Sequence, residues 1–505
     1  MSQSNDRCSA NPAWAATPAA YIAADTDNQL GSWWASQSGD VPFARALGQS
    51  FGDQRTFFEC GINREPSCTI SGCDVFARSD SPVWSYQALM SVMNLNMYFN
   101  AIFDGVVAGQ LGYTNSIPQI AKTFFPPQDE TFPFGDAAPW IIAILTILFA
   151  LPLLAGETAA LIGVGAGALL IGSTTTVNDQ LEPLPATNIL SVVEMQNYAS
   201  QYGESTRHTL SEWANTTFQG QKDGSDKTIL NYIAGGAFVD SKVIPTSKEI
   251  ESFYKAQMAS RTINAKWSTS RVFIMFTSTL DEDNISGPNQ TKYYSREDSG
   301  VYYLYQMHEG NRMTSQLGKP EGLDDLNGTQ FGISGQDVTK SSARAFRAGG
   351  FNYTQETQMK ELEAAMASNN TLDPFAEGAG WSGTWTIPVC DTGKYDWNVQ
   401  YDDSTLRYGR LPCCCGENCK DTKAFVEVAN IVGSQTFLRG CYEQLKPLAG
   451  IDFEKIDYGY KWEMTFQVAW LGWSDGIRAG VVIGMIVGGT VVFGLLLCCC
   501  CAILG

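Results

Sequence analysis

The sequence predicts a mainly α fold with a minor β component (α+β). In it, a disulfide-stapled ectodomain surrounds a hydrophobic helical hairpin, and one C-terminal transmembrane helix follows. Three observations lead to this expectation. Two long segments carry apolar residues at intervals of three or four, an internal stretch is nearly free of charge, and a second uncharged stretch ends the chain. Apart from four at the very end, the 14 cysteines form an even-numbered set, as disulfides require.

The composition excludes some classes of function. The chain has 505 residues, a length that suggests about two or three domains if it is soluble. Its 33 basic and 52 acidic side chains give a net charge of −19. This balance argues against a nucleic-acid partner and against a polybasic contact with anionic lipid, because both need an excess of Lys and Arg. The acidity is spread along the chain, and we interpret it as a contribution to solubility.

The first part of the chain is expected to be an N-terminal cap followed by a helix. Residues 1–82 contain four cysteines and no long periodic run, which predicts an irregular cap; the first residues also lack the apolar core of a signal peptide. The pattern over 83–110 predicts an amphipathic helix, with asparagines on its other faces. The apolar face, which we expect to be buried, consists of Tyr86, Met90, Met93, Met97 and Ala101. Residues 116–136, with Pro126 and Pro127, are expected to interrupt helical structure.

The hydrophobic hairpin is predicted at 137–172, inside a helical region that spans 83–218. Its single charge, Glu157, separates two uncharged runs, each near the length of one bilayer crossing. A second amphipathic helix is expected over 189–218. The sequence leaves two interpretations of these residues open. The hairpin either inserts into a bilayer or packs as buried core beneath the two helices that bracket it.

Residues 219–470 are expected to form a mixed α/β ectodomain. Thr246 and Glu249 have the spacing of a capping box at the start of a helix. The β-branched and aromatic runs 271–279 and 301–307 predict strands. A cysteine-rich loop at 413–419 follows, but it lacks paired ligand spacing and a nearby histidine, so disulfides are favoured over zinc.

The end of the chain, 479–504, predicts a transmembrane helix, because no charge interrupts it. Gly480, Gly484 and Gly488 share one face, which suits self-association through close helix contact. The terminal cysteines are candidates for acylation at the membrane boundary. These are Cys498, Cys499, Cys500 and Cys501. A GPI signal beginning near Ser474 is the alternative to a retained helix.

Glycosylation motifs and cysteines together indicate the secretory pathway. Six N-x-S/T acceptors fall in one region: Asn215, Asn284, Asn289, Asn327, Asn352 and Asn369. The disulfide candidates are Cys8, Cys60, Cys68, Cys73, Cys390, Cys413, Cys414, Cys415, Cys419 and Cys441, with their pairing open. The chain is therefore expected at the plasma membrane or cell surface, with its ectodomain outside.

No motif predicts chemistry. The G-x-S-x-G match at 472–476 abuts the apolar tail, and the chain has only two histidines. Phosphate-binding and dinucleotide-binding motifs are absent from the sequence. We therefore predict no catalytic residue, no cofactor and no metal site. The expected partners are membrane lipid, a second copy of the chain, and a surface protein or glycan.

Three sequence stretches carry a resemblance to known proteins. They are NMYFNAIFDGV at 96–106, TFFPP at 123–127 before the hydrophobic stretch, and LPCCCG at 411–416. In this order they resemble uncharacterised secreted or cell-surface glycoproteins of filamentous fungi. The resemblance implies secretion and no defined activity.

The leading hypothesis is a membrane-anchored extracellular glycoprotein with a structural, adhesive or partner-binding role. The alternative is a membrane-active glycoprotein, fusion or pore-forming, that inserts residues 139–172 into a bilayer. A secreted hydrolase is the third hypothesis, and it would require a pocket with convergent carboxylates.

Overall fold

The fold is taken from a computed structural model of the chain. It describes residues 11–37, 39–52, 58–76, 81–125, 192–222, 228–277, 289–309, 315–326, 331–354 and 377–391, with a few positions in 356–364 and 425–429. The chain divides into two compact units. Unit 1 comprises Met1–Trp267 and Glu321–Ile387, and unit 2 comprises Ser268–Pro320 and Pro388–Gly505. Within the described residues the protein is mainly helical with one small sheet, which confirms the predicted fold class at that level.

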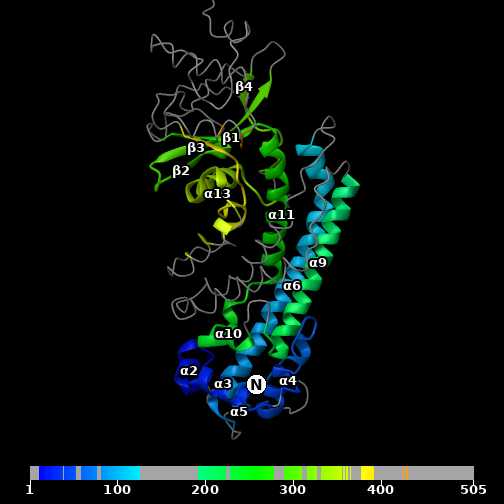
Figure 1. The fold of residues 1–505 in the computed structure, drawn as a ribbon, viewed down its shortest axis with the longest axis vertical. Coiled ribbons are helices and arrows are strands. Elements are labelled where there is room, and N and C mark those ends of the chain that lie inside the picture. The colour runs from blue at the N-terminus through cyan, green and yellow to red at the C-terminus, as the bar shows by residue number, and fades with distance from the viewer. Residues whose placement is uncertain are drawn as a thin grey trace, which may run out of the picture. The chain divides into compact units, whose positions relative to one another are not determined.

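Unit 1 is built on one long helix, α6 (Val83–Phe124), which is about 63 Å long at 1.5 Å per residue. Helix α9 (Val192–Gln219) and helix α11 (Ser247–Thr269) run beside it (Figure 1). The shorter helices of this unit are η1 (Pro12–Trp14), α2 (Pro18–Ala23), α3 (Thr26–Ala35), α4 (Phe43–Phe51), η2 (Glu65–Ser67), α5 (Cys73–Phe76), α10 (Ile229–Ile233), η3 (Ala234–Gly236), η4 (Ser241–Val243), α12 (Leu323–Leu326), α13 (Gly335–Gly349), η6 (Gly350–Asn352) and η7 (Gly378–Gly380).

The N-terminal cap is helical where an irregular segment was expected. Helices α2, α3 and α4 are each ten residues or shorter, so none is long enough to produce a clear apolar period. Local signals start the first of them, since Pro18 stands at its first turn and the Thr17 hydroxyl accepts the Ala20 N–H at 3.3 Å. Aromatic contacts then join the cap to α6, as between Phe51 and Trp84, whose rings lie 4.8 Å apart.

Helix α6 is longer than predicted, because it continues through Pro118 to Phe124. A proline inside a helix cannot donate to the carbonyl four residues earlier, here Thr114. The Gln196 side chain of α9 lies in a position to replace that donor, with its Nε2 3.4 Å from the Thr114 oxygen. A partner distant in sequence therefore makes the proline tolerable. The helix ends just before Pro126, where a stop was expected.

The buried face of α6 is also different from the predicted one. Met97, in the middle of the expected apolar face, is 41% exposed, whereas Asn94 and Asn96 are fully buried. Tyr86 is the exception on the methionine face and is buried as predicted. The asparagines are buried because their amides hydrogen-bond to backbone groups of other segments.

Helices α6 and α9 are antiparallel neighbours. The Gln110 amide donates to the Ala199 carbonyl, and Phe99 meets Trp213 edge to face with ring centroids 5.4 Å apart. The second predicted amphipathic helix is thus confirmed over its described part, with Met195 and Ala199 buried. Because the two helices are antiparallel, α6 ends and α9 begins at the same end of the pair (Figure 1).

Helix α11 approaches α6 closely and begins as predicted. A Cβ atom on Gly105 would lie 2.5 Å from the Ile250 side chain, so this contact depends on glycine. The capping box is present. The Thr246 N–H donates to the Glu249 carboxylate at 2.7 Å, and the Glu249 N–H donates to the Thr246 hydroxyl at 3.2 Å.

Unit 2 contains a mixed sheet with the order β2-β3-β1-β5, in which β4 also pairs with β3. Its strands are β1 (Val272–Thr277), β2 (Tyr293–Ser295), β3 (Gly300–Glu309), β4 (Ser315–Gly318) and β5 (Val389–Asp391), and the short helix η5 (Asn289–Thr291) precedes β2. β1 is antiparallel to β3 and parallel to β5, with Met275 opposite Tyr303 and Cys390. Both predicted strands are confirmed. They are nearly continuously apolar because β1 and β3 are central and buried on both faces.

Several predicted features lie outside the described residues. They are the hairpin 137–172, the cysteine-rich loop 413–419, the span 479–504 with Gly480, Gly484 and Gly488, and the terminal cysteines 498–501. Among the helices that the structure does describe, none has the length and apolar character needed to cross a bilayer.

Candidate functional site

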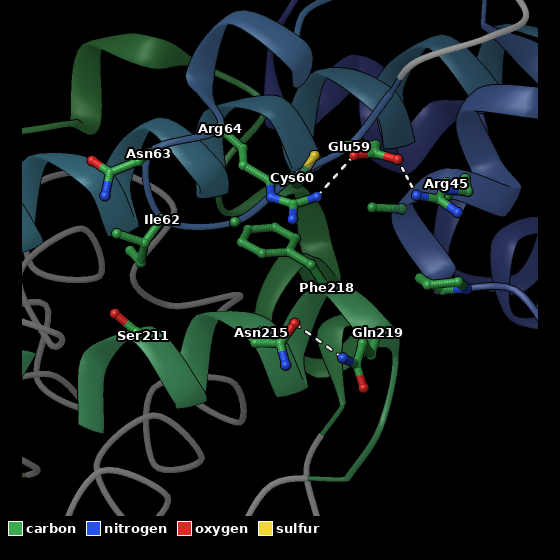
Figure 2. A pocket seen from close by; sticks show the side chains of 13 residues that line it. Arg45, Glu59, Cys60, Ile62, Asn63, Arg64, Ser211, Asn215, Phe218 and Gln219 are labelled. Atoms are coloured by element: carbon green, nitrogen blue, oxygen red, sulfur yellow. Dashed lines mark hydrogen bonds and ion pairs between the residues drawn. The ribbon is translucent and has the colours of Figure 1, made fainter. Parts of the chain in front are cut away.

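The candidate site is a hollow of about 400 Å³ in unit 1 (Figure 2). One wall is the loop that precedes η2, and the opposite wall is the last turns of α9. The start of α4 completes the lining. The lining residues are Pro42, Ala44, Arg45, Glu59, Cys60, Gly61, Ile62, Asn63, Arg64, Ser211, Asn215, Phe218 and Gln219.

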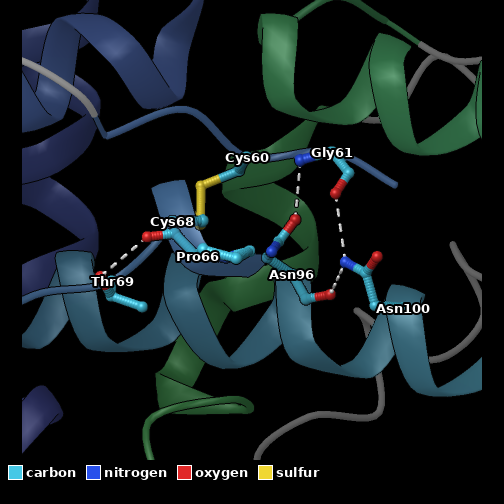
Figure 3. Close-up of a disulfide and its surroundings, with 7 residues drawn as sticks. All are labelled: Cys60, Gly61, Pro66, Cys68, Thr69, Asn96 and Asn100. Carbon is cyan, nitrogen blue, oxygen red and sulfur yellow. Dashed lines mark hydrogen bonds between the residues drawn. A yellow bond between two sulfur atoms is a disulfide. The ribbon is translucent and has the colours of Figure 1, made fainter. Parts of the chain in front are cut away.

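The loop wall is closed on itself by a disulfide between Cys60 and Cys68, which are eight residues apart (Figure 3). The Glu59 N–H also donates to the Ser67 carbonyl at 3.0 Å, so the two ends of the loop are joined twice. A cross-link of this span restricts the unfolded chain by about 2–3 kcal/mol in the loop-entropy treatment. In the folded protein, the disulfide and this hydrogen bond hold the two ends of the loop together.

Two buried amides of α6 fix the other side of the loop (Figure 3). The Gly61 N–H donates to Asn96 Oδ1 and the Asn63 N–H donates to Asn100 Oδ1, both at 2.7 Å. Asn100 Nδ2 donates in return to the Gly61 carbonyl at 3.1 Å. Asn63 itself has a left-handed backbone with φ of 60°, a conformation that asparagine tolerates better than most residues. Each side chain thus satisfies a loop backbone group that would otherwise be buried without a partner.

Charge at the rim of the hollow comes from one carboxylate between two guanidinium groups. Glu59 pairs with Arg45 through one oxygen and with Arg64 through the other, the second at 2.8 Å. The arginine side chains are 44% and 56% exposed, so these pairs contribute only about 0–1 kcal/mol each. Two arginines and one glutamate give this rim a net charge of +1, although the chain as a whole is acidic.

The α9 wall carries Asn215, one of the predicted glycan acceptors. Its Oδ1 accepts a hydrogen bond from Gln219 Nε2 at 3.0 Å, and its side chain is exposed. Phe218 also belongs to this wall, and its ring is largely buried against Phe99, with 5.7 Å between ring centroids. The hydroxyl-bearing member of the motif, Thr217, is only 1% exposed.

Two other predicted glycan acceptors fall in described residues. Asn289 begins η5 and Asn352 ends η6, and both side chains are exposed. The Thr291 hydroxyl is buried and accepts the Leu304 N–H at 3.2 Å. Asn284, Asn327 and Asn369 lie outside the described residues.

Among the disulfide candidates, Cys60 and Cys68 pair with each other. Cys73 and Cys390 each take part in a disulfide as well. The other candidates lie outside the described residues: Cys8, Cys413, Cys414, Cys415, Cys419 and Cys441.

A second polar cluster lies partly buried in unit 1. The Tyr353 and Ser382 hydroxyls donate to the same oxygen of Glu361, at 2.6 and 2.9 Å. Burial, and after it the charge of Glu361, raises the pKa of the Tyr353 hydroxyl. Arg261 interacts electrostatically with Tyr353, and burial lowers the pKa of its guanidinium to about 9. Because one carboxylate oxygen accepts hydrogen bonds from both hydroxyls, the arrangement suits a structural network better than a nucleophile.

Within the described ranges, no three His, Cys, Asp or Glu residues gather closely enough to hold a metal ion. His208 is 62% exposed and faces Glu212 across 3.6 Å, as a surface pair would. The hollow itself offers guanidinium, carboxylate, hydroxyl and amide groups, which suit the binding of a polar molecule.

Comparisons with protein-family models, with curated proteins and with solved structures found no match for this chain. Its function must therefore be inferred from its own residues.

Sequence reasoning placed Asn215 and Cys60 among the candidate residues but did not bring them together. It also missed Arg45, Glu59 and Arg64. One feature of the sequence could have indicated this loop contact. Three asparagines within seven positions are unfavourable inside a helix unless their side chains hydrogen-bond to other segments. Asn96 and Asn100 hold the Cys60–Cys68 loop, which lies about 35 residues earlier in the chain. Asn94 instead donates to the Phe238 and Val239 carbonyls.

Proposed function

We propose that this chain is a membrane-anchored extracellular glycoprotein with a structural, adhesive or partner-binding role at the cell surface. The observation that carries the proposal is the disulfide bonding of Cys60, Cys68, Cys73 and Cys390, because such bonds persist in oxidising compartments. Exposure of Asn215, Asn289 and Asn352 supports it, since a glycan needs solvent around its acceptor. The apolar tail 479–504 would supply the anchor.

The sequence resemblance to secreted or cell-surface glycoproteins of filamentous fungi fits the same proposal. The expected partners remain membrane lipid, a second copy through Gly480, Gly484 and Gly488, and a surface protein or glycan. The loop is held by the Cys60–Cys68 disulfide and by Asn96 and Asn100, and polar groups preorganised in this way suit the binding of a partner.

Expression in a secretory host tests the proposal. We expect a glycosidase to reduce the mass of the protein, and we expect mapping under non-reducing conditions to recover a peptide that joins Cys60 to Cys68. A variant ending at Arg478 should appear in the medium, while the full chain should stay with the membrane fraction. Unmodified acceptors and free thiols throughout the ectodomain would refute the proposal.

A second candidate, a membrane-active glycoprotein, is favoured by the topology of unit 1. Because α6 and α9 are antiparallel, residues 126–191 are tethered at both ends to one end of a helix pair. That connection contains the uncharged runs of 137–172. A long helix pair is a suitable support for presenting such a segment to a bilayer.

Dye release from liposomes by the purified ectodomain tests this second candidate. A variant with Ile144→Asp and Leu148→Asp should lose most of the leakage, because a charge at the centre of a membrane helix costs about 3 kcal/mol. The control is Val193→Asp on α9, where the wild-type side chain is already 64% exposed. If acid and protease treatment of the wild type both leave the liposomes intact, the candidate is excluded.

A further inference from the structure

The position of Asn215 in the wall of the hollow has a chemical consequence. Its Oδ1 is engaged by Gln219, but within the described residues its Nδ2, the atom that would carry a glycan, makes no hydrogen bond. The side chain is exposed and lines the hollow together with Ser211 and Gln219 of the same helix (Figure 2). A sugar on this nitrogen would start at the edge of a cavity already formed.

The motif also fixes when a sugar could be added. Thr217 is buried in α9, and its hydroxyl makes no hydrogen bond within the described residues. An enzyme cannot reach a buried hydroxyl in a packed helix, so transfer to Asn215 must precede the packing of α9 against α6. The sugar would thus be present while the hollow forms.

The lining of the hollow is complementary to a neutral sugar. The Glu59 carboxylate can accept hydrogen bonds from hydroxyl groups, and the guanidinium groups of Arg45 and Arg64 can donate to ring, hydroxyl or acetamido oxygens. The loop wall is held by the Cys60–Cys68 disulfide and by Asn96 and Asn100, so little ordering is required when it binds. Neither Asn289 nor Asn352 lines this hollow.

We propose that the hollow between the Cys60–Cys68 loop and α9 is an intramolecular carbohydrate site, which holds the first N-acetylhexosamine of the glycan on Asn215. This inference rests on the proposed glycosylation. The sugar joins α9 to the loop, and it protects the loop from opening.

Thr217→Val tests the inference with little disturbance of the fold. It removes the acceptor motif and replaces a buried, unpaired hydroxyl by a methyl group. We expect hydrogen exchange of residues 59–68 to become about fivefold faster and the melting temperature to fall by about 2–4 °C. The matched control Thr217→Ser keeps the motif and should behave as the wild type, and Asn352→Gln removes a glycan elsewhere without affecting this loop.

Enzymatic trimming of the folded wild type gives an answer even if a variant does not fold. An endoglycosidase that leaves one N-acetylglucosamine on Asn215 should preserve the slow exchange of residues 59–68, and complete removal of the glycan should abolish it. Mass spectrometry of the Asn215 peptide separates the two ideas. An unmodified asparagine there would defeat the proposed glycosylation at this site, whereas a modified one with unchanged loop exchange would overturn the carbohydrate site alone.

Discussion

Helix α6 of unit 1 and the β1–β3 pair of unit 2 bury their side chains by different rules. In β1, every position from Val272 to Met275 is buried and apolar, and the backbone groups pair with the neighbouring strand. In α6, buried positions include Asn94, Asn96 and Asn100, whose amides bond to loops from elsewhere in the chain. A face of α6 rich in methionine is left partly exposed.

The difference follows from where backbone hydrogen bonds are made. A strand pairs its backbone with another strand, so its side chains are free to be uniformly apolar. A helix satisfies its own backbone and leaves the loops packed around it to find other partners. In this protein, the asparagine side chains of α6 supply these hydrogen-bond partners. Because these polar residues are buried, the apolar pattern of the helix alone does not predict its buried face.

The largest expected effect tests the buried amides directly. Asn94 Nδ2 donates to the carbonyls of Phe238 and Val239 at 2.8 and 3.0 Å. Asn94→Leu leaves both carbonyls without this donor, and we expect the free energy of unfolding to fall by about 3 kcal/mol. The control Met97→Leu, on the exposed face, should change it by less than about 0.5 kcal/mol. If urea unfolding showed the same loss of unfolding free energy for Asn94→Leu and Met97→Leu, the contrast between the two faces of α6 would be wrong.

The next effect concerns the loop that α6 holds. Replacing Cys60 and Cys68 together by serine should lower the free energy of unfolding by about 2–3 kcal/mol through the loop-closure effect. Asn96 and Asn100 should still position the backbone, so the variant should fold. Chemical denaturation measures the loss. A double variant as stable as the wild type would show that the amides alone fix the loop.

The strand pair offers a smaller and more local test. Phe276 and Tyr302 face each other across β1 and β3, with stacked rings 4.5 Å apart. A double-mutant cycle with leucine at both positions should give a coupling of about 1 kcal/mol. The cycle for Phe273 and Tyr305, whose centroids are 6.2 Å apart, should give less. The comparison would be weakened if the more distant pair coupled more strongly.

The smallest effect belongs to the capping box of α11. Hydrogen bonds from Thr246 hold the pKa of Glu249 below its usual value. A carboxyl with a lowered folded-state pKa stabilises the protein at neutral pH, and this contribution is lost as the pH falls through the folded-state pKa. Because Glu249 is exposed, Glu249→Gln should cost less than about 1 kcal/mol at pH 7. Urea unfolding at pH 7 and pH 3 should show the gap between variant and wild type closing in acid.

Features that depend on neighbouring residues could be predicted from the sequence. The strands at 272–277 and 300–309, the capping box and the stop before Pro126 were all expected and are present. The continuation of α6 through Pro118 was not predicted. The Thr114 carbonyl, which Pro118 cannot bond, is paired with Gln196 of another helix. The hollow was likewise missed, since its walls come from segments about 150 residues apart in the chain.

The sequence by itself determined the class of fold, the two long helices beside the hydrophobic stretch, and the residues available for disulfides and glycans. Short-range patterns suffice for these, because helix periodicity, strand composition and capping act within a few residues. Only the tertiary structure decided which face of α6 is buried and that Asn215 borders the Cys60–Cys68 loop. Both depend on backbone groups that find their partners across long chain separations, and no local pattern encodes such a pairing.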